Sequence, residues 1–226
     1  MQNRFLLLAL LFFFPSLLQA QTFIGFNAGI SQSKTRLNFN VASTEIARRG
    51  DLLGLAIGIP LELKLNDVVR LQPELLFATE GALLSVLRPE EQRTYHNILY
   101  YLKIPILVKV LVLKEKNYQV GLLAGFTPAY AIGIKSFSFS FFNPLRLSTT
   151  ESISFATANI NRFDLALSAG ASVEKTIAQG IKMALTARYN MGVYNISQEV
   201  TRSSFTESLQ LTLGLWMPLK RKGKKG

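Results

Sequence analysis

The chain has 226 residues, 49% of them hydrophobic, which is enough for one domain with a sizeable core. It has no cysteine, and this excludes disulfides, thiolate metal sites and a cysteine nucleophile. The formal net charge is +11, but five of these charges lie in the last seven residues, and no basic patch with interleaved aromatic residues accompanies them, so no nucleic-acid partner is expected.

Residues 1–20 (MQNRFLLLALLFFFPSLLQA) follow the pattern of a secretory signal peptide. Arg4 is the only charge, an apolar run extends from Phe5 to Phe14, and Ala20 is a small residue at a suitable cleavage point. The run is shorter than the roughly 20 apolar residues that a membrane-spanning helix needs. We therefore expect residues 1–20 to be a signal peptide and the protein to be exported.

The rest of the chain alternates between apolar and polar side chains with the period of two that indicates β-strands. In the last such run, for example, Leu209, Leu211, Leu213 and Leu215 share one phase. Counting by alternation predicts eight strands, at residues 23–32, 52–65, 68–79, 97–113, 118–131, 162–174, 181–194 and 207–219. Between the first and last apolar residues of each run, no charged residue interrupts the apolar phase. The opposite phase carries the charges, which are Glu62, Lys64, Arg70, Glu74, Lys103, Lys109, Arg162, Asp164, Glu174, Lys182 and Arg188.

Alternation alone fits either a soluble barrel with an apolar interior or a membrane barrel with an apolar exterior. Nine of the 15 glycines lie in the polar phase, which fits a narrow, filled barrel interior better than a surface in water. The predicted joins alternate between short and long, as they do in outer-membrane barrels. The short joins are 66–67, 114–117 and 175–180, and the long ones are 33–51, 80–96, 132–161 and 195–206.

Aromatic residues of the apolar phase lie at the long-loop ends of their strands, where a girdle at the membrane interface is expected. They are Phe77, Tyr100, Tyr130, Phe163 and Tyr189. The sequence therefore predicts an all-β fold, an eight-stranded antiparallel up-and-down transmembrane β-barrel over residues 21–219, located in the cell outer membrane. Proline disrupts strand pairing, so we expect bulges or irregular pairing where prolines 60, 73, 105 and 218 lie within strands.

Three runs, LQPELLFATEGALL (71–84), YYLKIPILVKV (100–110) and GLLAGFTPAY (121–130), resemble the PorT-like outer-membrane β-barrel proteins of Bacteroidota. The resemblance implies an eight-stranded barrel of OmpX-like shape in a Gram-negative outer membrane. It also implies a link to type IX secretion, in which the namesake of the family serves. In contrast to the usual aromatic end of such barrels, the last strand ends at Leu219 and continues into KRKGKKG. We expect residues 220–226 to form a basic tail in the periplasm.

The charges of the polar phase have two interpretations. Inside a narrow barrel they should pair with one another, because an unpaired charge there is unfavourable. A cation-lined path for small anions would instead need an open lumen, which eight strands rarely leave.

His96 is the only histidine and lies at the long-loop end, as do Ser203, Ser204 and Glu207. A lipid esterase would need such residues to converge. Because the strands involved are not neighbours in the predicted barrel, we expect no catalytic site. No metal site is expected either, with one histidine and no cysteine, and no cofactor is expected.

In the loop after the fifth predicted strand, phenylalanines alternate with serines (SFSFSFF, 136–142). This pattern predicts that the flanking strands continue past the membrane as a hairpin with an aromatic stripe formed by Phe137, Phe139, Phe141 and Phe142. The stripe either packs on neighbouring loops or presents a strand edge to a protein partner.

Taken together, the sequence predicts a non-enzymatic outer-membrane barrel with a structural or protein-interaction role. Its partners would be outer-membrane lipid, lipopolysaccharide and an envelope protein bound through the long loops. A small-solute channel and an exported soluble lipocalin-like carrier are the alternatives.

Overall fold

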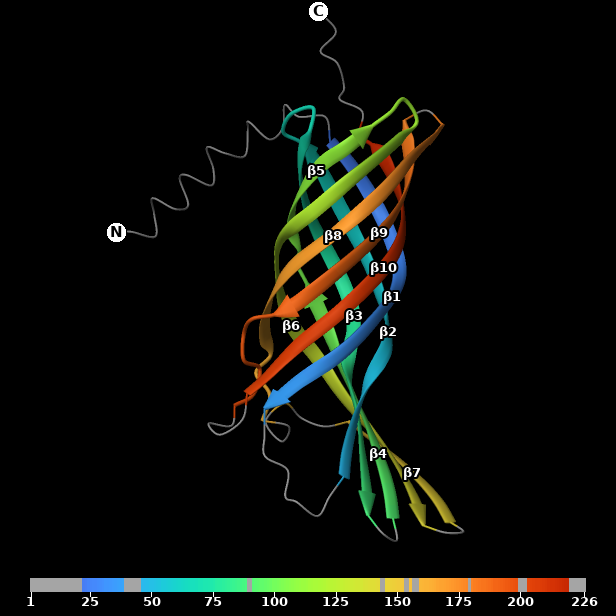
Figure 1. The fold of residues 1–226 in the computed structure, drawn as a ribbon, viewed down its shortest axis with the longest axis vertical. Helices are drawn as coiled ribbons and strands as arrows, with labels where there is room; N and C mark the ends of the chain where they lie inside the picture. The colour runs from blue at the N-terminus through green and yellow to red at the C-terminus, as the bar shows by residue number, and fades with distance from the viewer. Residues whose placement is uncertain are drawn as a thin grey trace, which may run out of the picture.

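The computed structural model describes residues 22–38, 46–88, 91–142, 145–152, 155, 159–178, 180–198 and 203–219. These residues form one antiparallel β-sheet (Figure 1). Its strands are β1 (Thr22–Asn38), β2 (Ile46–Lys64), β3 (Val69–Arg88), β4 (Glu91–Lys103), β5 (Ile106–Lys114), β6 (Tyr118–Phe142), β7 (Leu145–Ser152), β8 (Phe163–Ala178), β9 (Ile181–Gly192) and β10 (Ser203–Pro218). Over these residues, no helix is long and apolar enough to cross a membrane.

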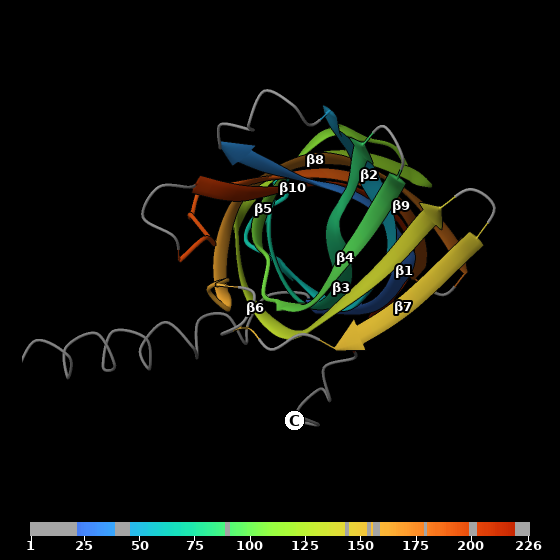
Figure 2. The ribbon, with the colours of Figure 1, turned by 90° about the horizontal axis from the view of Figure 1, so that it is seen from below.

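The sheet closes into a ring, which Figure 2 shows end-on. Strand β1 pairs with β10 from Phe23↔Pro218 to Asn38↔Ser203, so the first and last strands seal the barrel. Strands β4 and β5 share one position, because both lie between β3 and β6. Strand β7 pairs with β6 and lies off the ring. The ring therefore has eight positions, and the predicted eight-stranded antiparallel up-and-down barrel is confirmed.

The break between β4 and β5 lies at Pro105, within the predicted strand 97–113. Proline has no N–H to donate, so the ladder is interrupted there. The Pro105 carbonyl still accepts from the Glu74 amide at 2.9 Å, and the Ile104 amide donates to Pro128 at 2.9 Å. The pairing of β2 with β3 is likewise interrupted after Pro60↔Glu74 and resumes in the same register at Leu63↔Leu71. The irregular pairing expected at the prolines is therefore present at Pro60 and Pro105. At Pro73 and Pro218 the expectation was wrong, because they pair in register with Ile106 and Phe23.

The apolar phase of the ring faces outward. Leu53, Leu55 and Leu213 are 69%, 57% and 55% exposed, whereas Arg70 and Lys109 are 5% and 1% exposed. The arrangement is the reverse of a soluble barrel, where the apolar phase would converge on the axis. The alternative of a lipocalin-like carrier is therefore wrong.

The structure corrects the predicted long loops, because several of them are strand for much of their length. Strands β2, β3, β4 and β6 continue past the ring and, with β7, form a sheet that extends from the barrel (Figure 1). We call it the long-loop sheet. It comprises residues 46–51, 81–88, 91–99, 133–142 and 145–152. The opposite end of the barrel, where 65–68 and 115–117 join neighbouring strands, is the short-turn end.

A β-bulge separates the barrel part of β6 from its extension. Tyr101 pairs with Ala131 but Tyr100 pairs with Gly133, so Ile132 is an extra residue on β6. An extra residue reverses which side of the strand each later side chain faces. Ala131 and Ile134 consequently face the same, inner side of the sheet, and both are buried.

Candidate functional site

Five charged side chains form a cluster inside the barrel near the short-turn end. They come from five strands and are Glu62 (β2), Arg70 (β3), Lys109 (β5), Glu174 (β8) and Lys182 (β9). Glu62 accepts from Arg70 at 2.5 Å, from Lys109 at 2.7 Å and from Lys182 at 3.1 Å. Glu174 accepts from Lys109 and, at 3.3 Å, from Lys182. Each of the five side chains is at most 8% exposed, so the cluster is cut off from bulk water.

Two aromatic rings pack against this cluster. The Lys109 ammonium lies 5.0 Å from the centre of the Trp216 ring, and the Lys182 ammonium lies 4.0 Å from that of Phe23. Both distances are within the range of cation–π attraction. The rings therefore occupy space in the lumen and also stabilise two of its cations.

A second ion pair lies at mid-height. Arg188 donates to Glu74 at 2.8 Å and to the Gln210 side-chain carbonyl at 2.7 Å. Asn27 donates to the other Glu74 oxygen at 2.7 Å. Every partner in this group is buried, and together they join β1, β3, β9 and β10 across the lumen.

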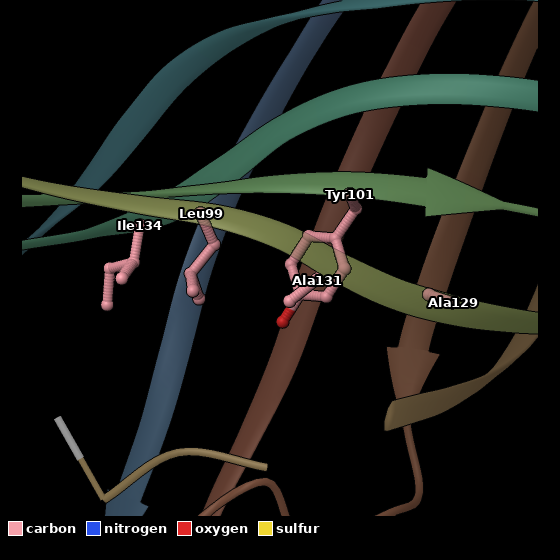
Figure 3. Packing of buried hydrophobic residues seen from close by; sticks show 5 residues of the cluster. All are labelled: Leu99, Tyr101, Ala129, Ala131 and Ile134. Atoms are coloured by element: carbon pink, nitrogen blue, oxygen red, sulfur yellow. The ribbon is translucent and has the colours of Figure 1, made fainter. Parts of the chain in front are cut away.

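The third group lies nearest the long loops. Lys103 pairs with Glu80 at 2.6 Å, and Thr206 donates to Asp164 at 2.5 Å. An apolar cluster from β4 and β6 lines the same end, with Tyr101 fully buried at its centre (Figure 3). Its buried members are Leu99, Tyr101, Ala129, Ala131 and Ile134. Charged and apolar groups therefore both fill this end.

Two of the predicted interior residues lie elsewhere, and one was missed. Lys64 is at the short-turn end, where its side chain is 33% exposed and pairs with Asp67 at 2.7 Å. Arg162 is exposed, and its guanidinium lies 4.6 Å from the Phe155 ring centre. Their prediction as interior ion-pair residues was wrong, since both are at strand ends that the alternation extends too far. Glu80 was assigned to a loop, although it continues the phase of Arg70 and Glu74.

With these corrections the described interior has equal numbers of acids and bases. The acids are Glu62, Glu74, Glu80, Asp164 and Glu174. The bases are Arg70, Lys103, Lys109, Lys182 and Arg188. All ten are buried, so the interior carries no net formal charge.

Small residues let these side chains fit. A β-carbon added at Gly121 would lie 2.9 Å from Lys109 Cγ, and one added at Gly58 would lie 2.5 Å from Glu74 Oε1. A small cavity lined by Asn27, Gln72 and Arg188, among others, measures ≈ 10 Å³. This is room for about one water molecule.

The five aromatics predicted at the membrane interface all face outward, with Tyr130, Phe163 and Tyr189 exposed by 48%, 46% and 41%. Phe77 and Tyr100 are partly buried and stack on each other with ring centres 6.3 Å apart. All five therefore lie on the outer wall.

The predicted aromatic hairpin is present as β6 and β7, which pair from Lys135↔Ser152 to Phe142↔Leu145. The partner of β6 is a separate short strand, however, and not an extension of β8. Phe139 is 41% exposed and contacts His96 edge-on, with ring centres 5.4 Å apart. Phe141 and Phe142 are in the strand, but their side chains lie outside the described residues.

The residues of the esterase alternative do not converge. His96 is on β4 next to Phe139, whereas Ser203, Ser204 and Glu207 are on β10, which pairs with β1 and β9. Ser204 and Glu207 are both buried, and Glu207 pairs with Lys34 at 3.2 Å. No group of three or more histidine and acidic side chains that could hold a metal occurs in the described part of the chain.

Comparison with known proteins gives a family. The model of the outer membrane protein beta-barrel domain matches residues 19–212. A search of curated protein sequences finds no significant match. Among solved structures, the outer-membrane protease OmpT of Escherichia coli matches at 10% identity and a TM-score of 0.48, covering 88% of this chain and 97% of that one. OprG of Pseudomonas aeruginosa matches at 10% identity and a TM-score of 0.48, covering 88% and 96%. Neisserial surface protein A matches at 10% identity and a TM-score of 0.44, covering 88% and 97%.

The family model covers most of the chain and agrees with a closed ring whose apolar side faces outward. Lipid therefore surrounds the outer face of the barrel, and the predicted location in the outer membrane is confirmed. The chain belongs to the outer membrane protein beta-barrel domain family and is an integral protein of the outer membrane.

Proposed function

We propose that this protein is a sealed, non-enzymatic barrel that anchors the long-loop sheet in the outer membrane and presents a strand edge to an envelope protein. The observation that carries the proposal is the pairing of β7. Among the described residues, β7 pairs with β6 alone, so its second edge keeps unpaired backbone donors and acceptors. Such an edge can accept a strand from another protein.

The filled interior supports an anchoring role over a transport role. Side chains from the ring pair across the lumen in three groups, and a cavity between them at mid-height measures ≈ 10 Å³. A path for solutes would require several buried ion pairs to separate at once, which is unfavourable. The rigid barrel would instead hold the long-loop sheet at a fixed height above the membrane.

The resemblance of residues 71–84, 100–110 and 121–130 to PorT-like proteins of Bacteroidota extends the proposal to type IX secretion. These runs lie in β3, in β4 and β5, and in β6, so they form the barrel wall. The envelope partner in this version is a component of the secretion machinery. Deleting the gene in its native cells should then lower the amount of type IX cargo in the medium. Unchanged secretion would exclude this version and leave the strand-edge proposal standing.

Photocrosslinking in native cells tests the strand edge directly. A photoreactive amino acid at Ser148 or Thr149 of β7 should give a discrete protein adduct. The same residue at Leu213, which is 55% exposed on the lipid-facing wall, serves as the control and should give none.

Two neighbouring proline substitutions provide a matched pair. In an antiparallel strand, successive N–H groups point to opposite neighbours, so Ser148→Pro and Thr149→Pro remove donors from opposite edges of β7. One of the two substitutions removes an N–H group from the edge of β7 that faces away from β6, and this one should abolish the adduct. Hydrogen exchange of the backbone amides should show that β6 and β7 still pair in this variant. An adduct that persists in both variants would contradict the proposal.

A deletion of Leu145–Ser152 gives the control for folding. Because β7 lies off the ring, the shortened protein should still fold and migrate as a compact species in unheated gels. It should also lose the adduct. A deletion variant that folds and gives the same adduct from the remaining sheet would show that β7 is not the contact.

A further inference from the structure

A pocket of ≈ 200 Å³ opens on the barrel wall at the long-loop end, where the ladder between β1 and β2 stops at Ser33↔Leu52. Its lining includes Gln32 and Lys34 of β1, Asp51 of β2, Tyr189 of β9 and Glu207 of β10. These side chains belong to the outward-facing phase of their strands. The lining also includes Ser33 and Ser208 of the inward-facing phase, but none of the ten interior charges, so the pocket is separate from the interior ion pairs.

The strand register fixes the height of this pocket. One outward row across the wall consists of Leu55, Ile30 and Leu211, which are 57%, 47% and 45% exposed. The next row towards the long loops contains Gln32, Leu209 and Tyr189, and the row after it contains Lys34 and Glu207. On β1 and β10 the outward side chains thus change from apolar to mixed to charged over three rows, whereas on β9 the third row still has the apolar Met191. This change marks the boundary between hydrocarbon and headgroups, so the pocket faces the polar part of the surrounding lipid.

The lining is rich in both donors and acceptors. Lys34 pairs with Glu207 at 3.2 Å, and Gln32 donates to Asp51 at 2.7 Å. Asp51 has a second oxygen and the amide of Gln32 has its own carbonyl, so both can accept hydrogen bonds from hydroxyl groups, while the ammonium of Lys34 has three N–H groups and can donate. Tyr189 and Leu209 add an apolar wall.

We infer that this pocket binds one sugar ring of a glycolipid in the surrounding outer leaflet. A sugar ring has hydroxyls at its edge and C–H groups on its faces, which match the polar lining and the Tyr189 side. The volume is below the ≈ 300 Å³ of pockets for drug-sized ligands, which fits a single ring. The inference goes beyond the strand-edge proposal and does not depend on it.

The charges argue against the other parts of a lipid. A phosphate would meet two carboxylates, Asp51 and Glu207, and a lysine that is already paired with one of them. An acyl chain would have to cover these ionised groups, which is unfavourable. A neutral polyhydroxyl group meets neither difficulty.

The test uses the full chain in phosphatidylethanolamine nanodiscs and follows backbone amide resonances by NMR. A minor fraction of monoglucosyl diacylglycerol supplies a sugar without phosphate. Phosphatidylglycerol at the same fraction supplies an anionic phosphate with a glycerol headgroup but no sugar ring. Methyl glucoside in solution supplies the sugar without the lipid, and Mg²⁺ without glycolipid tests for a cation.

With the glucolipid we expect saturable shifts at residues 32–34, 51, 189 and 207–209. Asp51→Asn should weaken this binding by about tenfold, the effect of losing one charge-assisted hydrogen bond. The matched control is Asp67→Asn, a carboxylate in an exposed ion pair at the opposite end, which should leave the affinity unchanged. The spectrum of each variant reports whether it is folded.

Several results would overturn the inference. Equal shifts with phosphatidylglycerol would mean a site for anions, and shifts with Mg²⁺ alone would mean a cation site. If methyl glucoside bound as strongly as the glucolipid, the ligand would be a soluble sugar and not a membrane glycolipid. No shift at these residues with the glucolipid would remove the site altogether.

Discussion

Glu62 is the residue on which the interior cluster most depends, because it accepts from three bases on three strands. Glu62→Gln removes the charge but keeps the size, so Arg70, Lys109 and Lys182 would share Glu174 alone. Loss of one partner from a buried ion pair typically costs about 3–5 kcal/mol. We expect a loss of that order in the free energy of unfolding by urea. The single tryptophan, 5.0 Å from Lys109, gives the fluorescence signal.

Two further variants test whether the loss reflects unpaired charge. Lys64→Met removes a base from an exposed pair, where such pairs contribute about 0–1 kcal/mol, and should change the stability little. Adding Lys109→Met to Glu62→Gln removes a surplus cation and should recover part of the loss. A double variant less stable than the sum of its single changes would contradict this explanation.

The pKa of the Asp67 carboxyl group provides a second test at the level of a single residue. Lys64 donates a hydrogen bond to it, and the charges of Lys64 and Lys114 add to the effect, so the pKa of Asp67 is lowered from its usual 3.8. A lowered pKa means that the pairing stabilises the turn at pH values above the usual pKa and is lost as the pH falls through the lowered pKa. In Lys64→Met the pKa should rise towards the usual value. The ¹³C shift of the Asp67 carboxyl group in micelles measures both values, and equal pKa values would refute the assignment.

At the scale of the element, the bulge in β2 requires a glycine. The register between β2 and β3 shifts between Asp51 and Ala56, and the Leu55 amide donates to the Thr79 hydroxyl at 2.8 Å. A β-carbon on Gly54 would lie 2.1 Å from the Thr79 carbonyl oxygen. Because the obstacle is backbone, Gly54→Ala should destabilise the protein by about 1–3 kcal/mol.

The control for this prediction is Gly133→Ala. There the added β-carbon would lie 3.3 Å from the Tyr100 side chain, which can move. We expect a change below about 1 kcal/mol in the same urea unfolding measurement. Equal effects of the two substitutions would mean that close backbone contact at Gly54 is not the cause.

The strands of the ring could be predicted from sequence because lipid on one side and packed polar groups on the other enforce a period of two. The signal ends where water wets both sides, so the extensions of β2, β3, β4 and β6 were assigned to loops. Glu80 is buried in the barrel and keeps the phase of Glu74, but it was missed because the alternation breaks directly after it, at residues 81–84. The bulge at Ile132 depends on pairing with Tyr100 and Tyr101 of another strand, and β7 depends on a turn after Phe142, neither of which alternation within one strand can reveal.

The sequence predicted that paired charges fill the interior, but it did not predict all of the residues that form these pairs. Alternation separates interior from exterior, so it identified nine of the ten buried charges that face the interior. It cannot locate the ends of the barrel, and Lys64 and Arg162 at those ends were therefore counted as interior residues. Which acid meets which base depends on the stagger of neighbouring strands. The predicted signal peptide (1–20) and basic tail (220–226) lie outside the described residues and stay predictions.

At the scale of the whole molecule, the filled interior predicts the absence of conductance. Purified protein in planar bilayers should show no stepwise openings under conditions in which a porin conducts. Tryptophan fluorescence of the same sample verifies folding. Regular, reproducible openings would contradict the sealed-anchor proposal and favour the channel, whatever the outcome of the crosslinking test.

The single inserted residue at Ile132 also has a consequence for how related sequences can diverge. Losing one codon there would turn Phe137 and Phe139 to the opposite side of the sheet, while every strand position below the bulge kept its orientation. Evolution or a protein engineer could thus exchange the phenylalanine and serine sides of the protruding hairpin without redesigning the membrane-embedded wall.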